Sequence, residues 1–109
     1  MDLAQRVYAL TAMLPGDERF GLIQQLRRGA ISIPSNIAEG HARGATKEFG
    51  RFISISRGSL AEVETQLEMC LRLGMLGEEP VAEVLACCDE LGRILTGLRN
   101  SLDSKLAQI

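Results

Sequence analysis

Residues 25–40 read QLRRGAISIPSNIAEG, and their apolar residues recur with the period of an amphipathic helix. The same face continues upstream through Ile23 and Phe20. It predicts a helix from about Asp17 to about His41. Within the quoted stretch, the face carries four residues at spacings of four, three and four: Leu26, Ala30, Ile33 and Ile37.

Pro34 lies inside this predicted helix. A proline there removes the hydrogen bond to the carbonyl of Ala30 and costs roughly 3 kcal/mol. Because the apolar face keeps its phase on both sides of Pro34, burial of both halves is expected to outweigh that cost. We therefore predict a kink rather than a break, with Ser32 or Asn36 satisfying backbone groups that the proline frees.

Three further segments show helical periodicity. The first spans about residues 2–14 and ends at the helix breakers of residues 15–17. Another begins at Thr46, a good N-cap residue, and reaches about Gly74. The last begins with two acids and a proline at residues 78–80, which suit a first helical turn. Their apolar faces consist of Leu3, Val7, Leu10 and Leu14; Phe49, Ile53, Ser56, Leu60, Val63, Leu67 and Cys70; and Val84, Cys88, Leu91, Leu95, Leu98 and Leu102.

Four helices joined by short loops favour antiparallel neighbours. The sequence therefore predicts an all-α protein, an antiparallel up-down-up-down four-helix bundle with a kinked second helix. A chain of 109 residues fits a single domain, residues 1–109. Only 4% of the residues are aromatic and none is tryptophan, so aliphatic side chains must build the core.

The N-terminal segment lacks the uninterrupted apolar run of a signal peptide or membrane span, because Asp2 and Arg6 interrupt it. We therefore expect a cytoplasmic protein. Of the three cysteines, Cys87 and Cys88 are adjacent, and neighbouring side chains on a helix cannot easily share one bridge. Together with Cys70 they are interpreted as buried thiols rather than a redox pair.

The net charge of −2 conceals a basic segment. Residues 19–57 carry seven cationic and two acidic residues, a local charge of +5, which leaves −7 for the rest. A basic segment on an acidic protein is a candidate anion-binding surface, although solvated helix faces produce the same pattern. Scarce aromatic residues argue against sequence-specific recognition of single strands. The candidate nucleic-acid surface comprises Arg27, Arg28, Arg43, Lys47, Arg51 and Arg57.

Polar residues at facing positions of the two central helices admit two interpretations. One is a functional pocket, and the other is a hydrogen-bonded network that fixes the register of the helices. The set consists of Ser32, Asn36, Glu39, Ser59 and Glu62, with Arg57 beside them.

Catalytic and metal chemistry are not indicated. The single histidine, His41, lies two residues from Glu39, whereas a di-iron bundle needs a Glu-x-x-His step from each of two helices. The cysteine spacing fits no zinc finger, and no glycine-rich elbow supports a nucleophile. We expect neither an enzyme nor a bound metal or cofactor.

Residues 25–40, together with KEFGRFI at 47–53 and ISRGSLAE at 55–62, resemble the signature of the four helix bundle protein family. Members of that family include reading frames within intervening sequences of bacterial large-subunit rRNA genes. The run SIPSNIAEG is too unusual to arise from helical patterning alone. Gly29 and Ser56 stand where the family usually has alanine.

The resemblance implies a four-helix protomer that assembles into a ring-like homopentamer, and it implies no enzyme. Related accessory proteins of diversity-generating retroelements resemble basic barrels that bind nucleic acid beside a reverse transcriptase. Our first hypothesis is a homo-oligomeric scaffold that uses apolar residues beyond the core faces as subunit contacts. The alternative is an assembly that binds RNA or DNA, or a protein that handles it, through the basic surface. The surplus apolar residues are Phe52, Ile55, Val81, Leu85 and Ile94.

Overall fold

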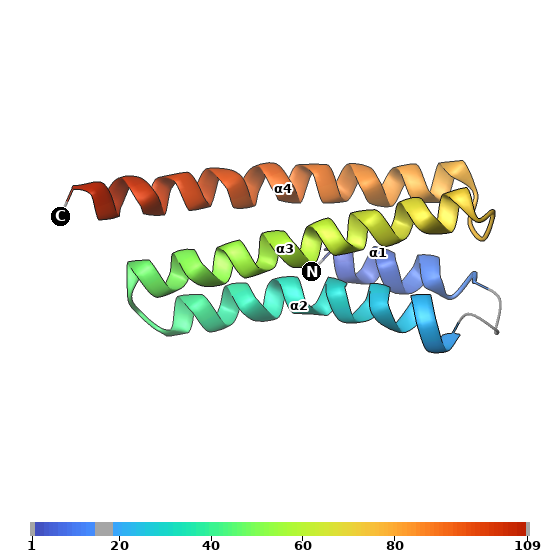
Figure 1. Ribbon diagram of the computed structural model, residues 1–109, viewed down its shortest axis with the longest axis horizontal. Coiled ribbons are helices and arrows are strands. Elements are labelled where there is room, and N and C mark those ends of the chain that lie inside the picture. The colour runs from blue at the N-terminus through green and yellow to red at the C-terminus, as the bar shows by residue number, and fades with distance from the viewer. Residues whose placement is uncertain (1, 15–18, 109) are drawn as a thin grey trace.

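The computed structural model describes residues 2–14 and 19–108. These residues form four α-helices and contain no β-strand, which confirms the predicted all-α class (Figure 1). A short π-helix, η2 (Arg19–Ile23), leads directly into the second α-helix. The α-helices are α1 (Asp2–Thr11), α2 (Gln24–Ala42), α3 (Thr46–Arg72) and α4 (Glu78–Ala107).

Successive helices reverse direction along the long axis of the molecule (Figure 1). The helix α2 packs against α3, α3 packs against α4, and α1 contacts both α2 and α4. This is the up-down-up-down order that short connections favour. None of the described helices combines the length and the apolar character needed to cross a membrane.

The predicted apolar faces meet in the core. All four residues of the first predicted face are buried, as are most of those on α2, α3 and α4. Each fully buried large aliphatic side chain stabilises the fold by about 1.5–3 kcal/mol relative to exposure. Burial is only partial at four residues of these faces: Ile37, Phe49, Leu91 and Leu98.

The helix ends differ from the prediction in two places. The helix α1 ends at Thr11 rather than Leu14, although the Leu14 side chain is still buried. The N-cap of α3 is Ala45 and not Thr46. Gly44 adopts a left-handed φ of 78° and turns the chain, so that Ala45 is already extended and its carbonyl accepts the Phe49 N–H at 2.9 Å. Thr46 is therefore the first helical residue, and no side chain caps this end.

The beginning of the second predicted helix is only partly described. The expected turn at residues 15–17 and the acidic first turn at residues 17–18 lie outside the described residues. An α-helix is predicted to run from there, but residues 19–23 instead form the wider π-helical turn η2. The side chain of Phe20, assigned to the apolar face, is also outside the described part of the structure.

The helix α2 continues through Pro34 without a break, as predicted, while the kink itself stays a prediction. Its two buried glycines bring it close to α3. A Cβ atom at Gly40 would lie 2.6 Å from Cβ of Phe52, and one at Gly29 would lie 2.7 Å from Cγ2 of Val63. Contacts that short leave no room for a side chain, so α2 and α3 approach each other through glycine.

The helix α1 is much shorter than its partners. With 10 residues against 30 in α4, it extends for about 15 Å where α4 extends for about 45 Å. It lies beside only the half of the bundle nearer the α3–α4 connection (Figure 1). Toward the opposite end, α2, α3 and α4 extend beyond α1 (Figure 1).

Candidate functional site

The polar set predicted between the central helices is partly brought together. The hydroxyl groups of Ser32 and Ser59 are hydrogen-bonded at 2.9 Å, which links α2 to α3. Nδ2 of Asn36 donates to the carbonyl and to the hydroxyl of Ser32, at 2.8 and 2.9 Å. Glu39 instead pairs with Arg43 at 2.9 Å, and Glu62 is exposed on α3.

Ser56 is a further member of this network that the sequence analysis assigned only to the apolar face. Its hydroxyl is completely buried and donates to the carbonyl of Ile33 at 3.1 Å. Together with Asn36, it supplies extra donors to two carbonyls in the turn that precedes Pro34. The sequence feature that could have indicated this role is a serine within an otherwise apolar face. The bonds favour the structural interpretation, because they hold the backbone beside the proline and fix the register of α2 on α3.

The cations of the predicted nucleic-acid surface divide into two groups. Nε of Arg27 donates to the Thr11 hydroxyl at 2.8 Å, and its guanidinium lies 4.5 Å from the ring centre of Tyr8. Arg43 and Arg51 pair with Glu39 and Glu48 and lie over the ring of Phe52. Among the described residues, the three others have no ion-pair partner: Arg28, Lys47 and Arg57.

Phe52 is covered by two guanidinium groups near the α2–α3 turn. Those of Arg43 and Arg51 lie 5.3 and 4.7 Å from the centre of its ring. Their ion pairs with Glu39 and Glu48, at 2.9 and 3.4 Å, are both exposed. Such pairs contribute little, about 0–1 kcal/mol. The arrangement explains why Phe52 is only 7% exposed, because the cations and Gly40 enclose it.

The surplus apolar residues are therefore fewer than predicted. Phe52 and Val81 are buried within the single chain, so the expectation that they are exposed is wrong. Val81 lies in the first turn of α4 and faces the core beside the α3–α4 connection. Leu85 is half-buried, whereas Ile55 and Ile94 are exposed, by 39% and 58%. The described chain also exposes Tyr8, Met13, Ile31, Met69 and Leu73.

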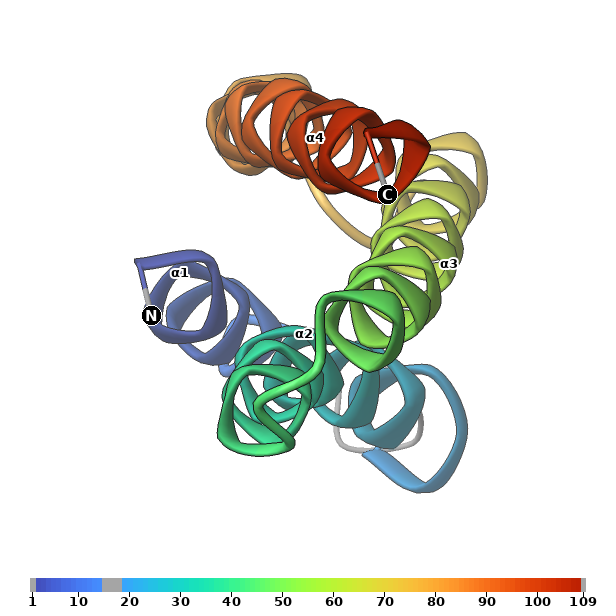
Figure 2. The same ribbon diagram turned by 90° about the vertical axis from the view of Figure 1, so that its left-hand side faces the viewer.

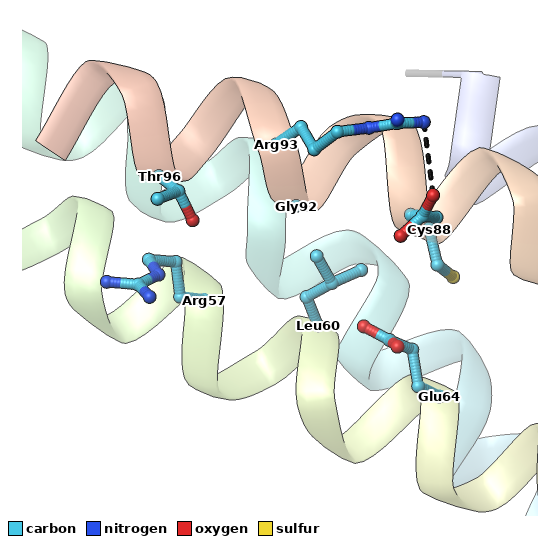
Figure 3. A pocket seen from close by; sticks show the side chains of 8 residues that line it. Arg57, Leu60, Glu64, Cys88, Gly92, Arg93 and Thr96 are labelled. Carbon is cyan, nitrogen blue, oxygen red and sulfur yellow. Dashed lines mark ion pairs between the residues drawn. The ribbon is translucent and has the colours of Figure 1, made fainter.

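A groove of about 370 Å³ runs between α3 and α4 (Figure 3). Arg57, Leu60 and Glu64 line it from α3. Its α4 side consists of Cys88, Asp89, Gly92, Arg93 and Thr96, and an exposed ion pair of 3.0 Å joins Asp89 to Arg93. Figure 3 shows Arg57 on α3 across the groove from Thr96 on α4, and Glu64 across from Cys88.

The thiol in this groove is not an activated nucleophile. Burial raises the pKa of Cys88 from its ordinary value of 9.0 to about 12, with smaller contributions from Glu64 and Cys87. Reactive cysteines have lowered pKa values, because the thiolate is the nucleophile. All three cysteines lie in the described residues and no disulfide joins them; Cys70 and Cys88 are buried and Cys87 is half-buried. Among the described residues, no three His, Cys, Asp or Glu side chains are placed to hold a metal ion.

The fold and the packed polar network define the class of the molecule as an all-α four-helix bundle protein whose central helices are held in register by buried serines. The chain belongs to the 23S rRNA-intervening sequence protein family, because the model of that family matches residues 1–97. The match includes α1, α2, α3 and two thirds of α4. No curated protein matches the chain.

Proposed function

We propose that the chain is a non-enzymatic, cytoplasmic scaffold that works as a homo-oligomer, with the homopentamer implied by the family resemblance as the expected state. The observation that carries the proposal is the exposure of large apolar side chains on every α-helix, among them Tyr8, Ile31, Ile55 and Ile94. Tyr8 and Ile31 line one groove, and exposed apolar side chains that gather in a patch usually mark protein interfaces. The shortness of α1, with 10 residues against the 30 of α4, supports the same proposal, since Leu98 on α4 remains only half-buried.

The mass in solution tests the proposal. One chain has a mass of 11.9 kDa, so light scattering at micromolar concentration is expected to give about 60 kDa for a closed pentamer. A mass that corresponds to another number of copies would still support a homo-oligomeric scaffold, but one with a symmetry other than that of a pentamer. A mass of 11.9 kDa across the accessible concentration range would contradict the proposal.

The second candidate function is nucleic-acid binding, and it is favoured by the unpaired cations of the basic segment. Lys47 and Arg57 are exposed on the first half of α3, and no described residue forms an ion pair with either. In an oligomer, each copy would repeat them, so that individually weak phosphate contacts would add up through multivalency.

If that candidate is correct, a short RNA or DNA duplex should bind with an affinity that falls steeply with salt, because phosphate contacts release counterions. Lys47→Glu with Arg57→Glu should weaken binding and reduce the dependence on salt by about one contact per lost cation. Arg6→Glu with Lys105→Glu, which changes the charge by the same amount at exposed residues of α1 and α4, serves as the control in a gel-shift series. Binding that is insensitive to salt or to the α3 variant would contradict a backbone contact.

A further inference from the structure

Two grooves flank α1, one on each side. The first lies between α1 and α2, has a volume of about 620 Å³, and is lined by Tyr8, Gln24, Arg27, Arg28, Ile31 and Ser32. The second lies between α1 and the edge of α4, has a volume of about 320 Å³, and is lined by Asp2, Leu3, Cys87, Glu90, Leu91 and Ile94. We call them the α1–α2 groove and the α1–α4 edge. Because α2 and α4 lie on different sides of α1, the two surfaces face different directions (Figure 2).

Each surface presents one exposed isoleucine. Ile31 on the α1–α2 groove is 45% exposed, and Ile94 on the α1–α4 edge is 58% exposed. The half-exposed ring of Tyr8 widens the apolar part of the α1–α2 groove. Removing these side chains from water would favour association.

The charges on the two surfaces are opposite. Arg28 lies beside Ile31, while Asp2 and Glu90 lie beside Ile94. All three are exposed, and within the described residues none of them forms an ion pair. A contact between identical surfaces would place like charges together, which destabilises an interface. A contact between the two different surfaces would place an arginine against carboxylates.

The charged residue and the isoleucine are separated by a similar distance along the helix on both surfaces. Arg28 and Ile31 are three positions apart on α2, and Glu90 and Ile94 are four positions apart on α4. Both spacings are about one helical turn, so the charged and apolar residues of each pair lie on one face. One placement of the two helices therefore lets Ile94 contact Ile31 while Glu90 reaches Arg28.

We propose that the α1–α4 edge of one copy of this chain docks into the α1–α2 groove of a second copy, with Ile94 against Ile31 and with Glu90 and Asp2 against Arg28. The inference rests on the proposed homo-oligomer and names the surfaces that form it. The contact joins two different faces, so it is heterologous, and repetition of it closes a ring or extends a filament. Complementary charge fixes the register and suppresses a like-with-like contact.

A charge swap tests the pairing. Arg28→Glu and Glu90→Arg should each raise the concentration needed for assembly by about tenfold or more, as measured by light scattering, because each places like charges together. The double variant carrying both changes should assemble at a concentration closer to that of the unchanged protein than either single variant does, since it restores opposite charges between positions 28 and 90 while Asp2 keeps its own charge. Asp89→Arg and Arg93→Glu alter exposed charges on another face of α4 and should leave assembly unchanged. Circular dichroism verifies that every variant remains helical.

Disulfide trapping tests which faces meet. In a Cys87→Ser background, Ile31→Cys combined with Ile94→Cys should give intermolecular cross-links under mild oxidation, and either substitution alone should not. Cys70 and Cys88 are buried and do not compete. Efficient cross-linking of the Ile31→Cys single variant would reveal a symmetric contact and overturn the proposal.

The remaining outcomes separate this inference from the proposed function. If the unchanged protein is a monomer, both fail. If it is an oligomer whose assembly is unaffected by Arg28→Glu and by Glu90→Arg, the scaffold stands and the proposed surfaces are wrong. If Arg28→Glu leaves assembly intact but abolishes binding of an RNA duplex, the α1–α2 groove faces nucleic acid, and the docking proposal is again overturned.

Discussion

Gly40→Ala is expected to lower the free energy of unfolding by about 1–3 kcal/mol, the usual cost of overpacking a tight contact. The added methyl carbon would lie 2.6 Å from Cβ of Phe52, an atom fixed to the backbone of α3 that cannot move aside by rotation. Either α2 must shift away from α3 or the cover of Phe52 must open. Urea denaturation followed by circular dichroism measures the loss.

The matched control is Gly58→Ala. Gly58 also lies within a helix, but a Cβ atom there meets nothing within 4 Å. The substitution should therefore stabilise the protein by about 0.5–1 kcal/mol, since alanine has the better helix propensity. Equal effects at the two positions would show that helix propensity, and not the approach of α2 to α3, determines the result.

The second large effect is a loss of stability at alkaline pH that depends on Cys88. Its pKa is raised to about 12 in the folded protein, against 9.0 for the ordinary thiol, so the folded state holds the proton more tightly. The corresponding stabilisation is complete below pH 9 and is lost as the pH rises toward 12. Between pH 9 and pH 10 the free energy of unfolding should fall by about 1 kcal/mol through this group.

Denaturation at pH 8 and pH 10 provides the measurement. Cys88→Val removes the titrating group, so its stability should fall less between the two pH values than that of the unchanged protein. Glu64→Gln should leave the fall nearly unchanged, because burial is the main cause of the raised pKa and the folded thiol stays protonated up to pH 10 without the Glu64 charge. Equal losses in the unchanged protein and in Cys88→Val would place the alkaline sensitivity in other groups.

Much of the fold could be predicted because the apolar residues keep a helical period over long segments. That period placed Leu3, Leu26, Leu60 and Leu95 in the core without any information about partners. It also continued through Pro34, where the local propensity opposes a helix, and the structure follows the period. Tertiary burial outweighs the local cost of the proline.

The errors arose where the conformation depends on neighbours in space. In the sequence, Phe52 lies outside the predicted apolar face and was therefore assigned to a subunit contact. In the structure, Arg43 and Arg51 cover its ring, and helical periodicity does not predict such a contact. Thr46 has a side chain suited to an N-cap. Because Gly44 turns the chain in a left-handed conformation, Ala45 is the N-cap residue instead.

The candidate site was less predictable than the fold. Ser32, Asn36 and Ser59 could be recognised as polar residues on facing helices, but Ser56 was hidden within the apolar face. The sequence shows that Gly29 stands where the family usually has alanine. Why glycine is required there is visible only in the structure. A methyl group there would lie 2.7 Å from Cγ2 of Val63.

The stacking of Arg27 on Tyr8 gives the protein a built-in optical reporter. The chain has one tyrosine and no tryptophan, so its intrinsic ultraviolet fluorescence comes from this single ring. That ring joins α1 to α2 through a guanidinium 4.5 Å from its centre. Tyrosine emission from the unlabelled protein therefore reports whether α1 is attached to α2. The far-ultraviolet circular dichroism, in contrast, reports all the helices together.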